Sequence, residues 1–176
     1  MARPQKNGVD YFPLDVDLMQ DKKVRLITAE FGTDGIAVLL HLLCEIYRNG
    51  YYKKWDADDA LFTTSFMGGK CAEQAVTKIV RACVKRGIFN PVLYRKHSIL
   101  TSAGVQRRYL RAVSMRDEIR IYEDYFLLDA DNKRDVPPYI RAKITFTRLP
   151  QRRRSSYSEG KALTDVLFAL PKGGGV

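Results

Sequence analysis

Residues 56–89 read DADDALFTTSFMGGKCAEQAVTKIVRACVKRGIF and carry most of the information about the fold. Two helix-forming segments, about 56–66 and about 71–86, flank a turn at Met67-Gly68-Gly69. The aspartate that opens the first segment is a suitable N-cap, and Gly87 is a typical residue at which the second would end. Two helices joined by a short glycine turn predict a helix-turn-helix motif.

The second of these helices has an apolar face and a largely basic face. Residues three and four apart lie on one side of a helix, so each face can be recognised from its spacing. The apolar positions are Ala72, Ala75, Val76, Ile79 and Cys83. The polar positions are Gln74, Thr77, Lys78, Arg81 and Lys85. A helix that lies in the major groove of DNA needs long donors for phosphates and base edges, so we expect residues 71–86 to form a recognition helix.

The segment after Gly87 predicts a small β-hairpin. Short apolar runs lie on both sides of a polar turn at Arg95-Lys96-His97. Two helices followed by a hairpin are the order of elements in a winged helix-turn-helix. The hairpin tip would then place Arg95 and Lys96 at the DNA backbone, and Lys70 would add a contact at the start of the recognition helix.

The remaining segments are predicted to surround this motif. Helices are expected over about 21–31, from 33 or 34 to 48, and from 101 or 102 to about 115, with a short strand over 51–55. Residues 1–116 are therefore predicted to form a mainly α domain with a small β-hairpin (α+β), a winged helix-turn-helix. Residues 117–176 are predicted to be a basic C-terminal extension. It would contain a strand near 140–147, a basic loop at 151–156 and a short amphipathic helix near 163–170.

The positive charge is concentrated in the middle of the chain. Residues 1–60 carry 8 basic and 10 acidic side chains, a net charge of −2. Residues 61–120 carry 12 basic and 3 acidic side chains (+9), and residues 121–176 carry 10 and 7 (+3). A local excess of this kind attracts a polyanion, and nucleic acid is the commonest one. The alternative, a lysine-rich surface that only maintains solubility, would distribute the charge more evenly.

No catalytic, metal or cofactor site can be recognised in the sequence. His41 and His97 are the only histidines and lie far apart. None of the phosphate-loop, dinucleotide-binding, nucleophile-elbow or zinc-protease motifs occurs. Asp15 and Asp17 are better explained as turn and cap residues than as a metal site, because no third ligand accompanies them. We therefore expect no enzyme activity, no cofactor and no metal.

The sequence also predicts a cytoplasmic protein. Cys44, Cys71 and Cys83 are scattered and contain no C-x-x-C pair, which is typical of reduced thiols. No stretch resembles the roughly 20 apolar residues that span a bilayer. The N-terminus has no apolar segment of the kind found in signal peptides.

Several motifs resemble a known family. They are residues 3–17 (RPQKNGVDYFPLDVD), 31–35 (FGTDG), 47–52 (YRNGYY), Trp55 and 87–89 (GIF). Over about residues 1–116 the chain resembles the Lin1244/Lin1753-like N-terminal domain family of bacteria and phages. That family looks related to the N-terminal domains of phage replisome organisers. The resemblance implies a winged-helix fold and a role at a phage or mobile-element replication origin, and it supplies no catalytic residues.

The function expected from these observations is duplex DNA binding without catalysis, as a replication initiator or organiser of a phage or mobile element. The expected partners are duplex DNA, replication proteins such as a helicase or its loader, and a second copy of the chain. Two alternatives remain open. The first alternative is a transcriptional regulator of a mobile element. The second is a winged helix that binds other proteins and has no DNA affinity.

Overall fold

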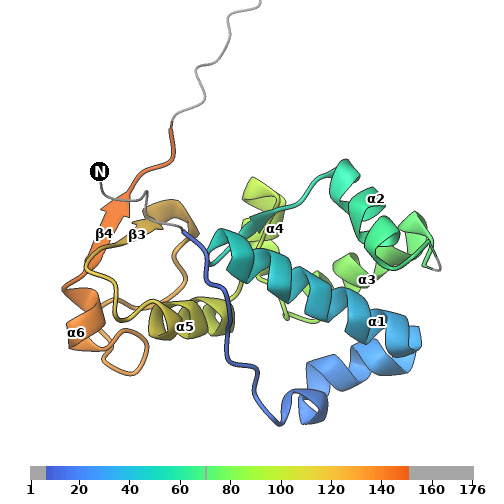
Figure 1. Ribbon diagram of the computed structural model, residues 1–176, viewed down its shortest axis with the longest axis horizontal. Helices are drawn as coiled ribbons and strands as arrows, with labels where there is room; N and C mark the ends of the chain where they lie inside the picture. The colour runs from blue at the N-terminus through green and yellow to red at the C-terminus, as the bar shows by residue number, and fades with distance from the viewer. Residues whose placement is uncertain (1–6, 70, 151–176) are drawn as a thin grey trace, which may run out of the picture.

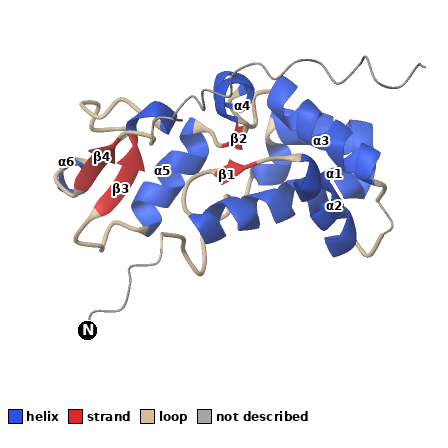
Figure 2. Ribbon diagram, turned by 90° about the horizontal axis from the view of Figure 1, so that it is seen from above, coloured by secondary structure: helices blue, strands red, loops and turns tan. Residues whose placement is uncertain are grey.

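The computed structural model describes residues 7–69 and 71–150, which form a mostly helical α+β protein (Figure 1). The helices are α1 (Lys22–Asn49), α2 (Ala57–Phe66), α3 (Glu73–Lys85), α4 (Pro91–His97), α5 (Ala103–Ala112) and α6 (Pro138–Arg141). The strands are β1 (Lys53–Lys54), β2 (Ile99–Leu100), β3 (Ile119–Tyr122) and β4 (Ile144–Thr147), and the short 3-10 turns are η1 (Leu18–Gln20) and η2 (Glu123–Tyr125). Helices α1, α2 and α3 gather at one end, and β3, β4 and α6 lie at the other (Figure 2).

Helix α1 is two helical segments separated at Gly32, as the sequence predicts. Gly32 has φ 63° and ψ −145°, a conformation outside the helical range that glycine adopts without steric cost. The side chain of Asp21 caps the first segment by accepting hydrogen bonds from the backbone N–H groups of Lys23 (2.7 Å) and Val24 (3.3 Å). The second segment continues to Asn49, where Gly50 ends it.

By length and mean hydropathy α1 is apolar enough to cross a membrane, which the sequence analysis did not anticipate. We interpret it as the central helix of the protein for two reasons. The break at Gly32 interrupts the helix, and Val38, Leu42 and Ile46 are fully buried where α1 packs in the core against α3 and β1.

The predicted pair of helices is present as α2 and α3. Asp56 and Asp59 form a capping box at the start of α2, and each accepts a hydrogen bond from the backbone N–H of the other. Gly68 and Gly69 in the connecting turn both have positive φ, so the turn depends on glycine. Helix α3 packs against both α1 and α2 through Val76, Ile79, Val80 and Cys83, which are all essentially inaccessible.

The hairpin predicted after Gly87 is wrong. Residues 91–97 form α4, because Asn90 caps the backbone N–H groups of Val92 and Leu93 (both 2.9 Å) and Pro91 occupies a favourable first-turn position. Ser98 then ends the helix in a left-handed conformation. The following strand, β2, pairs antiparallel with β1, which comes from the segment before α2. No β-hairpin follows α3 within residues 71–150.

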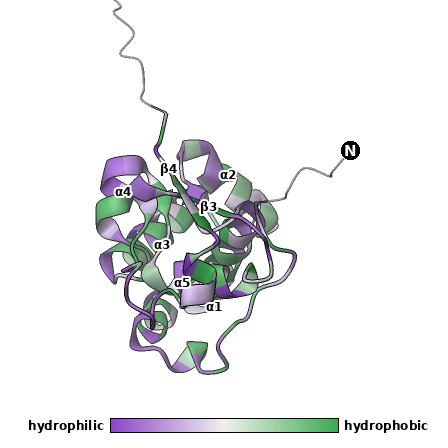
Figure 3. Ribbon diagram, turned by 90° about the vertical axis from the view of Figure 1, so that its left-hand side faces the viewer, coloured by the Kyte–Doolittle hydropathy of each residue, from purple (hydrophilic) through white to green (hydrophobic). Residues whose placement is uncertain are grey.

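The β3–β4 end is built from a parallel pair of strands. Ile119 lies opposite Ile144, and Tyr122 lies opposite Thr147. The predicted strand near 140–147 is therefore shorter than expected, because Ile140 belongs to α6 and is fully buried. In Figure 3, which views this end, α5 shows a hydrophobic face and a hydrophilic face. The predicted basic loop at 151–156 and the helix near 163–170 lie outside the described residues.

Buried residues from both sides of position 116 contribute to one core. Val105 and Leu110 of α5 belong to the same buried cluster as Ile121 and Ile140. A polar connection supplements this packing, because the buried side chain of Gln106 donates a hydrogen bond to the carbonyl oxygen of Tyr125 (2.8 Å) and accepts one from the N–H of Leu127 (2.8 Å). The segment containing β3 is thus fixed to the helices by both apolar and polar contacts.

Candidate nucleic-acid interface

Helix α3 presents the predicted polar face to solvent. Gln74, Lys78, Arg81 and Lys85 are exposed, and Thr77 is half-buried. We call these five residues the α3 stripe. The opposite face of α3 is buried against α1 and α2, so the hydrophobic packing of the helix orients the α3 stripe outward. Within the described residues, Lys78, Arg81 and Lys85 form no ion pair, which leaves their charges free to meet an external anion.

The C-terminal end of α3 is held by basic residues that do not belong to the stripe. Arg86 forms an ion pair with Glu30, and the ammonium group of Lys23 donates a hydrogen bond to the carbonyl oxygen of Gly87 (2.9 Å). Both contacts attach the end of α3 to the first segment of α1. These cations therefore position the helix, whereas the cations of the α3 stripe have no comparable partner among the described residues.

The prediction that Arg95 and Lys96 lie at a hairpin tip is wrong. Both residues occupy the last turn of α4. Both side chains are exposed. The structure therefore divides the predicted DNA-binding residues between two helices, with five on α3 and two on α4. Lys70 is outside the described residues.

The arginines of α5 are mostly engaged in contacts within the protein. Arg107 pairs with Asp135 (2.8 Å), and Arg108 pairs with Asp15. Just beyond α5, Arg116 donates hydrogen bonds to the carbonyl oxygens of Asn7 (2.9 Å) and Gly8 (2.6 Å). These arginines fasten the N-terminal and C-terminal segments to the helices.

Burial also shifts the pKa of a histidine and of a cysteine in the helices. The His41 ring stacks on Phe66 with centroids 4.1 Å apart, and burial lowers its pKa. Burial raises the pKa of the Cys83 thiol to about 12, which disfavours the thiolate form. Within residues 7–69 and 71–150, no three His, Cys, Asp or Glu side chains come together in a way that could hold a metal ion.

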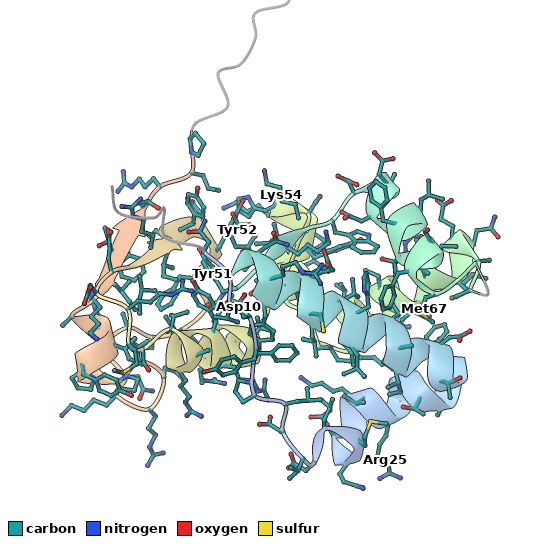
Figure 4. All side chains as sticks on the ribbon, in the orientation of Figure 1. Asp10, Arg25, Tyr51, Tyr52, Lys54 and Met67 are labelled. Atoms are coloured by element: carbon teal, nitrogen blue, oxygen red, sulfur yellow. The ribbon has the colours of Figure 1, made fainter. Side chains whose placement is uncertain are left out.

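A second feature was missed by the sequence analysis. Two adjoining cavities, of about 450 and 580 Å³, share Tyr52, Tyr122 and Pro150 in their walls. In Figure 4, Tyr52 and Lys54 lie on the upper side of the molecule, between the β3–β4 end and α4. The signal in the sequence was the group of tyrosines at 51, 52, 122 and 125, but the two pairs are about seventy residues apart, and only the fold brings them together.

The fold and the α3 stripe define a class of protein, namely a small α+β protein in which a three-helix group exposes a basic helix. The chain belongs to the Lin1244/Lin1753-like N-terminal family, whose model matches residues 11–105. It is 33% identical, over 98% of its length, to an uncharacterised phage-related protein Lin1244/Lin1753 from Listeria innocua serovar 6a. The chain spans 55% of the length of that relative. A search of solved structures gave no significant match.

Proposed function

We propose that this protein binds duplex DNA through the α3 stripe and has no catalytic activity of its own. The observation that carries the proposal is the exposed cationic face of α3, whose lysine and arginine side chains have no acidic partner among the described residues. A protein that neutralises phosphates with such side chains gains affinity by releasing counterions from the DNA.

The dimensions of a helix suit this role. An α-helix with its side chains is about 10–12 Å across, and the major groove of B-DNA is about 12 Å wide. Lys78 and Arg81 lie near the middle of the stripe, where both could reach phosphates or guanine edges. Gln74 lies on the same face one turn earlier and is suited to an adenine edge. Glu73 in the first turn is the acidic residue nearest this surface in sequence, and it would disfavour a phosphate at the very start of the helix.

The biological setting that we propose is a phage or mobile element in the bacterial cytoplasm. The phage-related relative supports it, and the resemblance to replisome organisers favours a role at a replication origin. Replication proteins such as a helicase or its loader, and a second copy of this chain, are the further partners that this setting implies.

The experiment is fluorescence anisotropy of labelled duplex DNA, measured across a salt series with wild type and with Lys78→Glu/Arg81→Glu. We expect wild type to bind with a log–log salt slope of several units, since each phosphate contact contributes roughly −0.9. The variant should lose about tenfold or more of the affinity at low salt, and the loss should become smaller as the salt concentration rises. Sequencing the DNA that wild type selects then distinguishes a replication origin from an operator near a promoter, which a transcriptional regulator would bind.

A matched control is Lys133→Glu/Arg134→Glu. These two exposed cations lie before α6, at the opposite end of the molecule from α3, and the change in net charge is the same (Figure 1). The control should bind duplex DNA nearly as well as wild type. Equal losses in both variants would show that only net charge matters, and the role of the α3 stripe would be rejected.

One observation favours a second candidate, a module that binds another protein. Leu61, Phe62 and Phe66 of α2 are 54%, 68% and 64% exposed, which is unusual for large apolar side chains that lie so close together in one helix. If wild type shows no duplex binding near physiological salt, this α2 face becomes the better candidate for the functional surface.

A further inference from the structure

A groove lined by tyrosines runs between β1, the end of α4 and β3. It consists of the two adjoining cavities described above, whose shared wall includes Tyr52 and Tyr122. We call it the tyrosine groove. It is separate from the α3 stripe, because none of the stripe residues lines either cavity.

The aromatic rings of the groove are held in fixed positions. Tyr52 packs edge-on against Tyr125 with centroids 4.7 Å apart, and Tyr122 packs edge-on against the same ring at 5.6 Å. The hydroxyl of Tyr51 accepts a hydrogen bond from the backbone N–H of Tyr122 (2.7 Å), which ties β3 to the segment before β1. Tyr52 and Tyr122 nevertheless remain half-exposed, so part of each ring is available to a ligand.

Basic side chains line both parts of the groove. Lys54 and Lys96 line the larger cavity, and Arg120 and Arg148 line the smaller one. Lys54 and Lys96 form no ion pair among the described residues. The two arginines pair with carboxylates.

The partners of those arginines are Glu118 (3.0 Å from Arg120) and Glu123 (3.5 Å from Arg148). Both arginine side chains are largely exposed, at 70% and 88%. Ion pairs in such positions contribute little free energy, so a phosphate can replace the carboxylate at small cost.

The groove also contains an unsatisfied polar atom. The side chain of His97 lines the larger cavity beside Tyr125, and its Nε2 atom is buried and has no hydrogen-bond partner among the described residues. Buried polar atoms without a partner are rare in folded proteins, and a rotation of the ring toward the cavity would let a ligand supply the missing hydrogen bond.

Fixed aromatic rings, flanking cations and an unpaired polar atom match the chemistry of an unpaired nucleotide strand. Bases stack on aromatic rings, while cations follow the phosphates and polar atoms meet the base edges. A duplex is a poor fit, because its base faces are already stacked on one another. We propose that the tyrosine groove binds single-stranded nucleic acid, with bases stacked on Tyr52 and Tyr122 and phosphates held by Lys54, Lys96, Arg120 and Arg148.

The chemistry of the tyrosines is consistent with a polyanionic ligand. A phenol is already neutral at physiological pH, and burial raises the pKa of Tyr52 further, to about 12, so the ring does not repel phosphate. This inference goes beyond duplex binding by α3 and does not depend on it.

The experiment is anisotropy with labelled oligothymidylate and oligouridylate of about 15 nucleotides, near the upper end of known site sizes. Wild type is compared with Tyr52→Leu/Tyr122→Leu, which keeps apolar side chains in place but removes the aromatic rings. We expect that variant to bind at least about tenfold more weakly, since stacking of a base on one aromatic ring is worth about that factor or more. Tyr52→Phe/Tyr122→Phe should restore binding. Affinity for only one of the two oligomers would identify the strand as DNA or RNA.

Two further variants separate recognition from folding. Tyr11→Leu/Tyr139→Leu removes two exposed tyrosines outside the groove and should bind like wild type. Lys54→Glu/Lys96→Glu changes two exposed lysines without altering the aromatic packing, and it should also weaken binding by about tenfold or more. If wild type binds neither oligomer, or if both groove variants bind as well as wild type, the proposal is overturned.

The same variants distinguish this proposal from the proposed function. Lys78→Glu/Arg81→Glu should lose duplex binding and keep single-strand binding, and the groove variants should show the reverse. A groove variant that loses both, while its thermal unfolding matches that of wild type, would mean that one surface binds both ligands, and the separate groove would be rejected.

Discussion

The α3 stripe and the tyrosine groove are both basic, but they are built in different ways. The stripe is one face of one helix, contains no aromatic residue, and is oriented by apolar packing on the opposite face. The groove is assembled from several distant segments, and polar contacts and tyrosine rings hold it together. The difference is the reason that we propose different ligands for the two surfaces. A regular row of donors matches the phosphates of a duplex, whereas aromatic rings between cations match a strand whose bases are unpaired.

Among the changes that should distinguish the two regions, we expect the largest effect, a loss of stability, from substitution of Gln106. It is 2% exposed, and Gln106→Leu leaves the buried carbonyl oxygen of Tyr125 and the partly buried N–H of Leu127 without these partners. Each unsatisfied group costs about 1–3 kcal/mol, so the free energy of unfolding should fall by roughly 2–6 kcal/mol. Chemical denaturation measures this loss, and the exposed Gln20→Leu provides the control.

Under conditions in which the Gln106→Leu protein is still folded, we expect it to bind single strands more weakly and to bind duplex DNA as wild type does. Gln106 holds the segment that carries Tyr122 and Tyr125, and it lies outside α3. Equal weakening of both activities in a folded sample would contradict the difference between the regions.

A smaller effect is expected at Gly8, where the N-terminal segment crosses the end of α1. A Cβ atom at this position would overlap the carbonyl oxygen of Arg48, so Gly8→Ala must displace the segment that carries Asn7, a wall residue of the smaller cavity. Overpacking of this kind costs about 1–3 kcal/mol. We expect a lower thermal unfolding temperature and weaker binding of oligothymidylate, with unchanged duplex affinity. Unchanged stability would show that the segment moves aside freely.

A third prediction concerns the salt dependence of binding. Lys78→Ala/Arg81→Ala removes two phosphate contacts, so the log–log salt slope for duplex DNA should decrease in magnitude by roughly 1.8 units. The slope for a single strand should stay the same, because neither residue lines the tyrosine groove. Titrations at four or more salt concentrations measure both slopes. A changed single-strand slope would indicate that the strand also contacts α3.

The smallest effect is a pH dependence of stability that comes from His41 in the three-helix end. Burial lowers the pKa of His41, with smaller contributions from Glu45, Arg48 and Lys53. The unfolded chain therefore binds this proton more readily than the folded protein does. Stability should be complete above the unfolded pKa of about 6.5 and should decrease as pH falls toward the lower folded pKa. The test is chemical denaturation of wild type and His41→Gln between about pH 7.5 and 5, a range that spans the unfolded pKa. The stability of the variant should depend less on pH than that of wild type.

The helical end was predictable because its signals are local. Asp56 caps the helix that it was expected to cap, and Gly32 and the Gly68-Gly69 turn lie where the chain needs positive φ. The exposed face of α3 followed from residue spacing alone. None of these features requires information about distant parts of the chain.

The segment after Gly87 was mispredicted because two local signals conflict there. The apolar run Val92-Leu93-Tyr94 is typical of a strand, but Asn90 and Pro91 form a strong helix start, and that signal prevails in the structure. The tyrosine groove was not predictable for another reason. The position of Tyr122 beside Tyr52 depends on the parallel pairing of β3 with β4 and on the contacts of Gln106, which the sequence pattern does not specify.

The most direct test of duplex recognition by α3 is a titration of isotope-labelled protein with duplex DNA, followed by amide chemical shifts. We expect the largest shifts at residues 74–85, at DNA concentrations where the groove residues Tyr52 and Tyr122 are little affected. Shifts concentrated in the tyrosine groove or on the exposed face of α2, or no shifts near physiological salt, would contradict the assignment of duplex binding to α3.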